Sequence, residues 1–276
     1  MLAIIRMSVA IVVLAVPASG AYAQSDFDGP WEKFSISVGA FVTESETTLQ
    51  INSNNSGLGA VVDLENALGV ERNFRTYRID AVYRLGQSRR HQIEFHYFDS
   101  NRTGDKVLDQ DLQIGDKLFP AGTGVTTEFG LRFANFDYAY NFLMDDRVRL
   151  GVSAGLHTTG VSLNVAATDG SKAGDESFTA PLPVIGLRAD VILAPRWRLK
   201  ADVNLFYLEY DQFRGKIGDT LLGIEYIPFK NFGFGFGINS VTYNIKGDGD
   251  DPNGMDFDGQ MKFHLTGALL YGKYFF

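Results

Sequence analysis

Hydrophobic and polar residues alternate along most of this chain, and a period of two predicts β-strands whose successive side chains face opposite sides. The pattern is clearest from Gly259 to the C-terminus. Every second residue counted back from the end is apolar, aromatic or small, and these residues form one face: Phe276, Tyr274, Gly272, Leu270, Ala268 and Thr266. No stretch with a helical period competes with this alternation, so the sequence predicts an all-β protein.

Ten segments alternate in this way. They cover about residues 31–43, 74–86, 91–97, 125–142, 148–156, 178–193, 197–207, 222–226, 232–238 and 259–276, and the fifth can extend to residue 165. In the fourth segment the apolar face changes from Phe129, Leu131 and Phe133 to Phe136, Tyr138, Tyr140 and Phe142. Because one extra residue flips every following side chain, we expect a β-bulge near Asn135.

The connections between these segments alternate in length. Those near residues 87, 145, 195 and 229 are short, whereas those at 45–73, 103–124, 167–177 and 247–258 are long or polar. A ten-stranded transmembrane barrel predicts this rhythm, with short periplasmic turns and longer outer loops. Within the first long connection, Asp63 to Gly69 predicts a short helix with an Asp cap and a Gly stop. Aromatic residues near segment ends suit the two interfacial girdles of such a barrel: Trp31, Tyr97, Trp197, Tyr226 and Tyr274.

The N-terminus predicts export. Arg6 gives a positive start, Met7 to Val16 an apolar run, and Ala21-Tyr22-Ala23 a cleavage site, so we expect residues 1–23 to be a signal peptide and 24–276 a single barrel domain. The chain contains no Cys, so an exported fold must be closed by its sheet and not by disulfides. A formal charge of −8 argues against nucleic acid as a partner. The mean hydropathy of −0.06 is compatible with a barrel, because only alternate residues face lipid.

The second face of the strands carries charges of both signs. We expect these side chains to point into the lumen: Arg78, Asp80, Arg84, Glu94, His96, Glu128, Arg132, Arg149, Arg188, Asp190, Lys200, Asp202, Glu225 and Lys273. Balanced charges in a confined interior usually pair, which predicts a filled polar core. The alternative is a charged pore lining. Ten strands lie nearer the filled end of the barrel series, since eight strands are just filled by side chains.

Candidate chemistry is limited. Glu94 and His96 share one strand face, as do Ser153 and His157. Omptin-like proteases use an Asp–His pair, and no Asp-x-His motif occurs in this sequence. The acidic loop after Asp248 departs from the EF-hand pattern, because Pro252 and Gly259 occupy ligand positions. We therefore expect no catalytic residues, no metal site and no cofactor.

The leader, the alternating strands, the connection rhythm and the ending Tyr274-Phe275-Phe276 resemble a small outer-membrane β-barrel protein of Gram-negative bacteria. The run from Asp63-Leu64-Glu65 through Tyr83-Arg84-Leu85 to His91-Gln92-Ile93-Glu94 is similar to a group of uncharacterised barrels.

This resemblance implies a closed antiparallel up-and-down barrel in the outer membrane, with Tyr274 and Phe276 as the signal for the barrel-assembly machinery. It implies contact with outer-membrane lipids and lipopolysaccharide, and it leaves the oligomeric state open. A plugged structural or surface-interaction barrel is the expected function. The alternatives are a narrow, porin-like channel and a lipid- or peptide-directed hydrolase.

Overall fold

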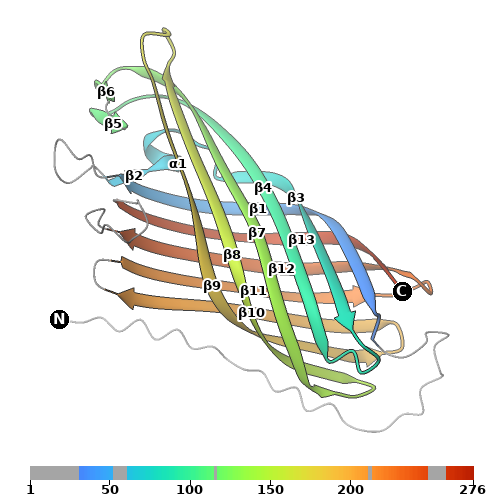
Figure 1. Ribbon diagram of the computed structural model, residues 1–276. Helices are drawn as coiled ribbons and strands as arrows, with labels where there is room; N and C mark the ends of the chain where they lie inside the picture. Colours follow the sequence, from blue (N-terminus) through green and yellow to red (C-terminus); the bar gives the residue numbers. More distant parts are fainter. Residues whose placement is uncertain (1–30, 52–60, 115–116, 211–212, 248–258) are drawn as a thin grey trace, which may run out of the picture.

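Ten long antiparallel strands form one closed barrel in a computed structural model of the chain (Figure 1), which describes residues 31–51, 61–114, 117–210, 213–247 and 259–276. The ten strands are β1 (Phe34–Ile51), β3 (Asn73–Leu85), β4 (His91–Val107), β7 (Gly124–Met144), β8 (Val148–Ala167), β9 (Ala173–Ala194), β10 (Trp197–Tyr210), β11 (Phe213–Tyr226), β12 (Phe232–Gly247) and β13 (Gly259–Phe275). Each strand pairs with its neighbour in the chain, which confirms the predicted up-and-down topology.

The barrel closes where the first long strand meets the last. β1 pairs with β13 from Ser35↔Phe275 to Ile51↔Gly259, so the terminal strand also completes the sheet. Closure leaves no open edge along this seam, and it satisfies the backbone groups that a membrane cannot hydrogen-bond. Among the described residues, no helix is long and apolar enough to span a bilayer.

Short elements gather at one end of the barrel (Figure 1). They are β2 (Val61–Asp63), α1 (Leu64–Ala67), β5 (Leu112–Ile114) and β6 (Lys117–Phe119). We call this end the loop end. The opposite end, with the connections 86–90, 145–147, 195–196 and 227–231, is the turn end.

The predicted short helix is confirmed as α1. Asp63 caps it, because its Oδ1 accepts a hydrogen bond from the Asn66 N–H at 2.9 Å. Gly69 follows with a φ of +70°, a conformation that favours glycine. The segment that contains α1 completes the wall between β1 and β4 on the loop-end side of the short strand β3. On one side β2 pairs with β1, and on the other the Glu71 N–H donates to the Thr103 carbonyl of β4.

The strands are longer than the alternation of outward apolar residues suggested. β1 continues to Ile51, β4 to Val107 and β8 to Ala167, so parts of the connections expected at 45–73 and 103–124 are strand. The physical reason is a change of environment along each strand. Near the turn end the outward residues are apolar, and towards the loop end they are polar, as at the step from Leu156 to Thr158.

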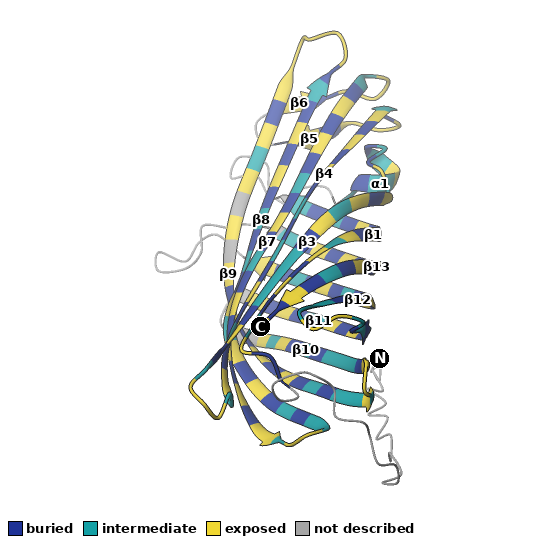
Figure 2. Ribbon diagram, turned by 90° about the vertical axis from the view of Figure 1, so that its right-hand side faces the viewer, coloured by how far each residue is buried: buried dark blue, intermediate teal, exposed yellow. Residues whose placement is uncertain are grey.

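The interior changes in the opposite sense. Buried and exposed residues alternate along every strand (Figure 2), but the buried ones are polar near the turn end and mainly apolar near the loop end. The part of the barrel nearer the turn end therefore has a lipid-facing belt around a polar lumen. The part nearer the loop end has a polar surface around a hydrophobic core.

The prediction of a β-bulge near Asn135 is wrong, and the inversion of the apolar face explains why. β7 keeps one phase from Val125 to Asn141, and its register shift lies between Asn141 and Leu143. Phe129 points inward and is fully buried, whereas Phe136 points outward with 56% exposure. The apolar face of β7 changes because core replaces lipid as its surroundings, and the strand itself stays regular.

Candidate functional site

Charged side chains fill the lumen behind the lipid-facing belt. The guanidinium of Arg188 on β9 is the centre of the first group. Its Nε lies 2.8 Å from Glu94 Oε2 and 3.9 Å from Asp202 Oδ1, and its Nη2 lies 3.7 Å from Asp137 Oδ2. Lys200 adds a second cation beside Asp202 at 3.2 Å. Four strands are therefore joined across the lumen by one set of ion pairs.

Two further pairs flank this group. Arg149 Nε donates to Asp190 Oδ2 at 3.0 Å, which joins β8 to β9. Arg78 Nε donates to Asp80 Oδ1 at 2.8 Å, and the same oxygen lies 2.6 Å from His96 Nδ1. All these side chains are largely withdrawn from solvent. Such groups are costly to bury singly, and their pairing offsets that cost.

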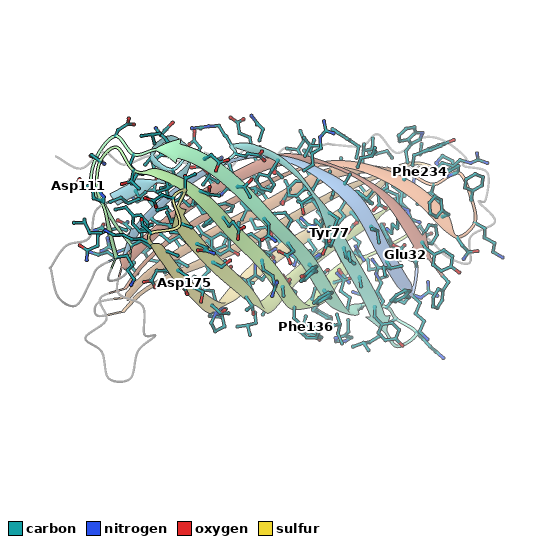
Figure 3. The ribbon with its side chains drawn as sticks, turned by 90° about the horizontal axis from the view of Figure 1, so that it is seen from above. Glu32, Tyr77, Asp111, Phe136, Asp175 and Phe234 are labelled. Carbon is teal, nitrogen blue, oxygen red and sulfur yellow. The ribbon has the colours of Figure 1, made fainter. Side chains whose placement is uncertain are left out.

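Glu32 closes the turn end of the lumen. Its carboxylate accepts from Arg198 Nη1 at 2.7 Å and from Lys273 Nζ at 2.8 Å, and Arg84 Nη1 lies 3.6 Å away. Burial raises the pKa of this carboxyl, but Lys273, Arg84 and Arg198 outweigh that effect and hold it well below its usual range. Figure 3 places Glu32 near one end of the barrel and Asp111 and Asp175 near the other.

Trp31 corrects a second expectation. It is buried at the turn end and not part of an outer girdle. Its indole Nε1 donates to the Asp145 carbonyl at 2.7 Å, and its ring lies 5.3 Å from the guanidinium of Arg149 and 5.7 Å from that of Arg198. Folding the segment before β1 into the lumen mouth satisfies the indole N–H and covers the ion pairs. The alternation pattern placed Trp31 in the first segment and in an outer girdle, but β1 begins only at Phe34, so strand phase does not determine where Trp31 and Glu32 point.

Most of the expected lumen charges lie inward, but Glu128 and Arg132 do not. Both are on the outer face of β7, where the Arg132 side chain is 66% exposed and lies 3.3 Å from Asp99. Their assignment followed from the phase expected for the first half of this strand, and that phase was wrong. The inward residues are Arg78, Asp80, Arg84, Glu94, His96, Arg149, Arg188, Asp190, Lys200, Asp202, Glu225 and Lys273.

An aromatic layer separates the charged lumen from the hydrophobic core. Phe133 is its centre, with its ring centroid 5.5 Å from Phe98, 5.3 Å from Tyr243 and 6.1 Å from Phe263. Phe41 contacts Phe98 edge-on at 5.6 Å. These rings form one apolar cluster that joins five strands inside the barrel, and we call it the aromatic septum.

One buried ion pair lies beyond this septum. Arg102 Nη1 of β4 donates to Glu65 Oε1 of α1 at 2.7 Å, and its guanidinium lies 5.2 Å from the ring of Phe74 and 4.8 Å from that of Phe129. Arg102 therefore fastens the helix that completes the wall to the interior of the barrel.

Two small cavities lie in the described part of the lumen. A cavity of about 30 Å³ lies between the charged network and the aromatic septum, and a second of about 20 Å³ lies within the network. A water molecule occupies about 30 Å³ in the liquid. Each cavity therefore has room for one or a few water molecules.

The buried acidic and imidazole groups form no accessible catalytic set. Glu94, His96 and Asp137 bring ligand atoms within 4.8 Å of one another, which could hold a metal ion. Arg188 already supplies a cation to two of them. His157 Nε2 lies 3.4 Å from Asp137 Oδ2, and both side chains are fully buried. Ser153 lies four residues from His157 along β8, roughly 13 Å in an extended strand, so these residues form no triad.

No protein-family model and no curated protein sequence matches the chain. Solved structures do. The outer-membrane protease OmpT from Escherichia coli is similar with a TM-score of 0.54 and 13% identity, over 90% of this chain and 97% of that one. The transport unit of the autotransporter AIDA-I from Escherichia coli matches with a TM-score of 0.42 and 7% identity, over 92% and 93%. Ail from Yersinia pestis matches with a TM-score of 0.35 and 10% identity, over 87% and 99%.

The likeness to OmpT shows the fold. Together with the outward apolar belt, it confirms the closed β-barrel expected from the sequence and supports the expected location in a bacterial outer membrane.

Proposed function

We propose that this outer-membrane barrel is a non-conducting protein whose lumen is plugged by its own side chains and whose outward surface carries an interaction role. The ion-pair network of the lumen supports this proposal above all. Arg188, Glu94, Asp137 and Asp202 connect four strands across the interior. The aromatic septum and the hydrophobic core add two more filled layers in series with the network.

A channel for solutes would need a continuous aqueous path. The cavities of about 30 and 20 Å³ have room for only one or a few water molecules each. The network also holds charges of both signs in direct contact, whereas an ion-selective pore lining presents one sign to the solution.

Hydrolysis is the other alternative, and the likeness to the protease OmpT makes it worth stating. A protease must bring its general base to a peptide in solution. The two side chains of the Asp137–His157 pair are fully buried, with the aromatic septum between them and the loop end. We therefore favour a surface-interaction role over hydrolysis.

Planar-bilayer recording of the refolded protein tests the plug directly. We expect no stepwise conductance from the wild type. Arg188→Ala removes the central cation and leaves Glu94 and Asp137 without it, which for a buried pair costs about 3–5 kcal/mol, less where water enters. Its denaturant unfolding midpoint should therefore fall clearly.

Arg132→Ala is the matched control. It also deletes an arginine, but one whose side chain is 66% exposed on the outer face. Its unfolding midpoint should stay close to that of the wild type. Open wild-type channels whose ion selectivity follows Arg188 would overturn the proposal in favour of transport.

A further inference from the structure

A large hollow lies on the outer wall of the barrel. It has a volume of about 520 Å³ and is formed by outward residues of β4, β7, β8 and β9. We call it the wall depression. Its size falls within the 300–1,000 Å³ typical of small-ligand sites.

Strand register builds the wall depression from two rows that cross all four strands. One row is Asp99, Arg132, Gly160 and Thr179, paired in that order. The next row towards the loop end is Asn101, Gly130, Ser162 and Ser177. Each row has a glycine near its middle and polar side chains around it. The Ser162 hydroxyl lies where a Cβ on Gly130 would stand, so the hollow is centred on Gly160 in the first row and has a polar rim.

The space above Gly160 is open, so packing against neighbours does not require a glycine at this position. A Cβ added there would meet its nearest atoms, Arg132 Cβ and Thr179 Oγ1, only at 3.8 Å. A larger side chain would therefore fit sterically and would project into the hollow. Glycine within a strand weakens it and often marks the close approach of a ligand or another backbone.

The polar groups of the rim are fixed and balanced in charge. Arg132 Nε donates to Asp99 Oδ2 at 3.3 Å, and Tyr97 Oη donates to the same oxygen at 3.1 Å. The rim also offers the amide of Asn101 and several hydroxyls. One cation paired with one anion gives little attraction for a bare phosphate, whereas planar side chains with hydroxyls match the donors and acceptors of a sugar.

The height of the wall depression along the barrel indicates which molecule would supply that sugar. In the row directly towards the turn end, Tyr97 pairs with Ala134 and Ala134 with Thr158, and the lipid-facing residues Phe136 and Leu156 follow. The depression therefore begins where the apolar belt stops. Headgroups of the outer leaflet occupy this level if the loop end faces outward.

We propose that the wall depression binds the core sugars of a lipopolysaccharide molecule in the outer leaflet. The inference deepens the surface-interaction part of the proposed function and does not depend on the plugged lumen. A failure here would leave the conductance result unchanged, and an open channel would leave this site unchanged.

The test uses the refolded full-length barrel in detergent with purified lipopolysaccharide that keeps its inner core sugars. Gly160→Leu fills the hollow. Gly218→Leu is the matched control, because Gly218 is an outer-wall glycine on β11 with no atom within 4 Å of an added Cβ. We expect at least tenfold weaker binding for Gly160→Leu by native mass spectrometry, and unchanged binding for Gly218→Leu. Heat-modifiable migration verifies that both variants fold.

Lipid A without core sugars should bind the wild type weakly, and soluble core oligosaccharide should displace the full molecule. Asp99→Asn combined with Arg132→Gln should also weaken binding while keeping the size of both side chains. Equal binding by the wild type and Gly160→Leu, equal binding of lipid A, or failure of the soluble sugar to compete would each overturn the proposal.

Discussion

Glu32 is a single residue on which three cations converge. Arg198 and Lys273 contact its carboxylate directly, and Arg84 lies close by. Glu225 contacts Lys273 as well, at 2.9 Å, but Glu32 is the carboxylate that all three cations share. Because like charges in a confined space repel, removing this shared negative charge should destabilise the turn end.

Glu32→Gln should therefore lower the unfolding midpoint clearly, by about 3–5 kcal/mol if the cations stay buried and less if water enters. The measurement is denaturant unfolding at neutral pH. As a control, Glu128→Gln changes an exposed carboxylate on the outer face of β7 and should leave the midpoint unchanged. A small effect of Glu32→Gln would mean that the three cations find other partners.

The same residue makes a pH-dependent contribution. Because the folded pKa of Glu32 lies well below its ordinary value of 4.5, its stabilisation is fully present above that pH. It is lost progressively as the pH falls below that value and is gone once the pH lies below the folded pKa. The gap between the midpoints of the wild type and Glu32→Gln should thus stay constant from pH 7 to about 5 and narrow in stronger acid. A gap that widens on acidification would contradict this account.

At the scale of the strand, β7 shows how surroundings set the meaning of a hydrophobic pattern. Its inward residues Phe129 and Phe133 belong to a core, while its outward residues Phe136 and Tyr138 face lipid. Both sets are aromatic, but they occupy opposite faces at different heights. A strand that crosses from membrane to core therefore changes apolar face without changing phase.

A pair of alanine substitutions on this one strand tests the change of surroundings. Phe129→Ala should cost about 3–5 kcal/mol of unfolding free energy, because it leaves a cavity among close-packed neighbours. Phe136→Ala should cost clearly less, because mobile lipid chains can fill the space left by an outward side chain. Unfolding in the same lipid vesicles measures both, and equal losses would argue against a core near the loop end.

Sequence alternation was sufficient to predict the class, the ten strands and α1, because period two and the Asp63 cap are local signals. It was also sufficient for the inward phase of Arg188 and Glu94, which lie opposite lipid-facing neighbours. It failed for Glu128 and Arg132, because in that part of β7 the apolar residues point inward to the core and the polar residues point outward. It was wrong for Trp31, which it placed in an outer girdle, and it gave no signal for Glu32, because the burial of both residues depends on the mouth of the barrel. It also gave no signal for the hollow at Gly160, which requires register across four strands.

For the whole molecule, the C-terminal residue is expected to act in assembly. Phe276 is 62% exposed at the end of the lipid-facing row of β13, and its carbonyl accepts from the N–H groups of Lys33 and Phe34. Phe276→Asp keeps those backbone bonds but places a charge where the assembly machinery is expected to bind. We expect reduced insertion in cells, measured by heat-modifiable migration of outer-membrane fractions.

Refolding of the purified Phe276→Asp variant in detergent is the control, since it needs no assembly machinery. We expect it to reach the wild-type fold, because the ion pairs of the lumen do not involve this ring. Normal abundance of the variant in the outer membrane would remove the role assigned to Tyr274 and Phe276.

The orientation of the molecule follows from its two unequal ends. The belt lies near the turn end, while the loop end has a hydrophobic core and the extra elements α1, β2, β5 and β6. Outer-membrane barrels have short periplasmic turns and long outer loops, so the loop end should face the outside of the cell.

A peptide epitope inserted at Gly170 sits in an exposed turn of the loop end with a φ of +73°. An insertion between Pro195 and Arg196 sits in an exposed turn of the opposite end. Antibody added to intact cells should label the first and reach the second only after the outer membrane is permeabilised. The reverse labelling would invert the barrel, and the wall depression would then lie at the inner leaflet, out of reach of lipopolysaccharide sugars.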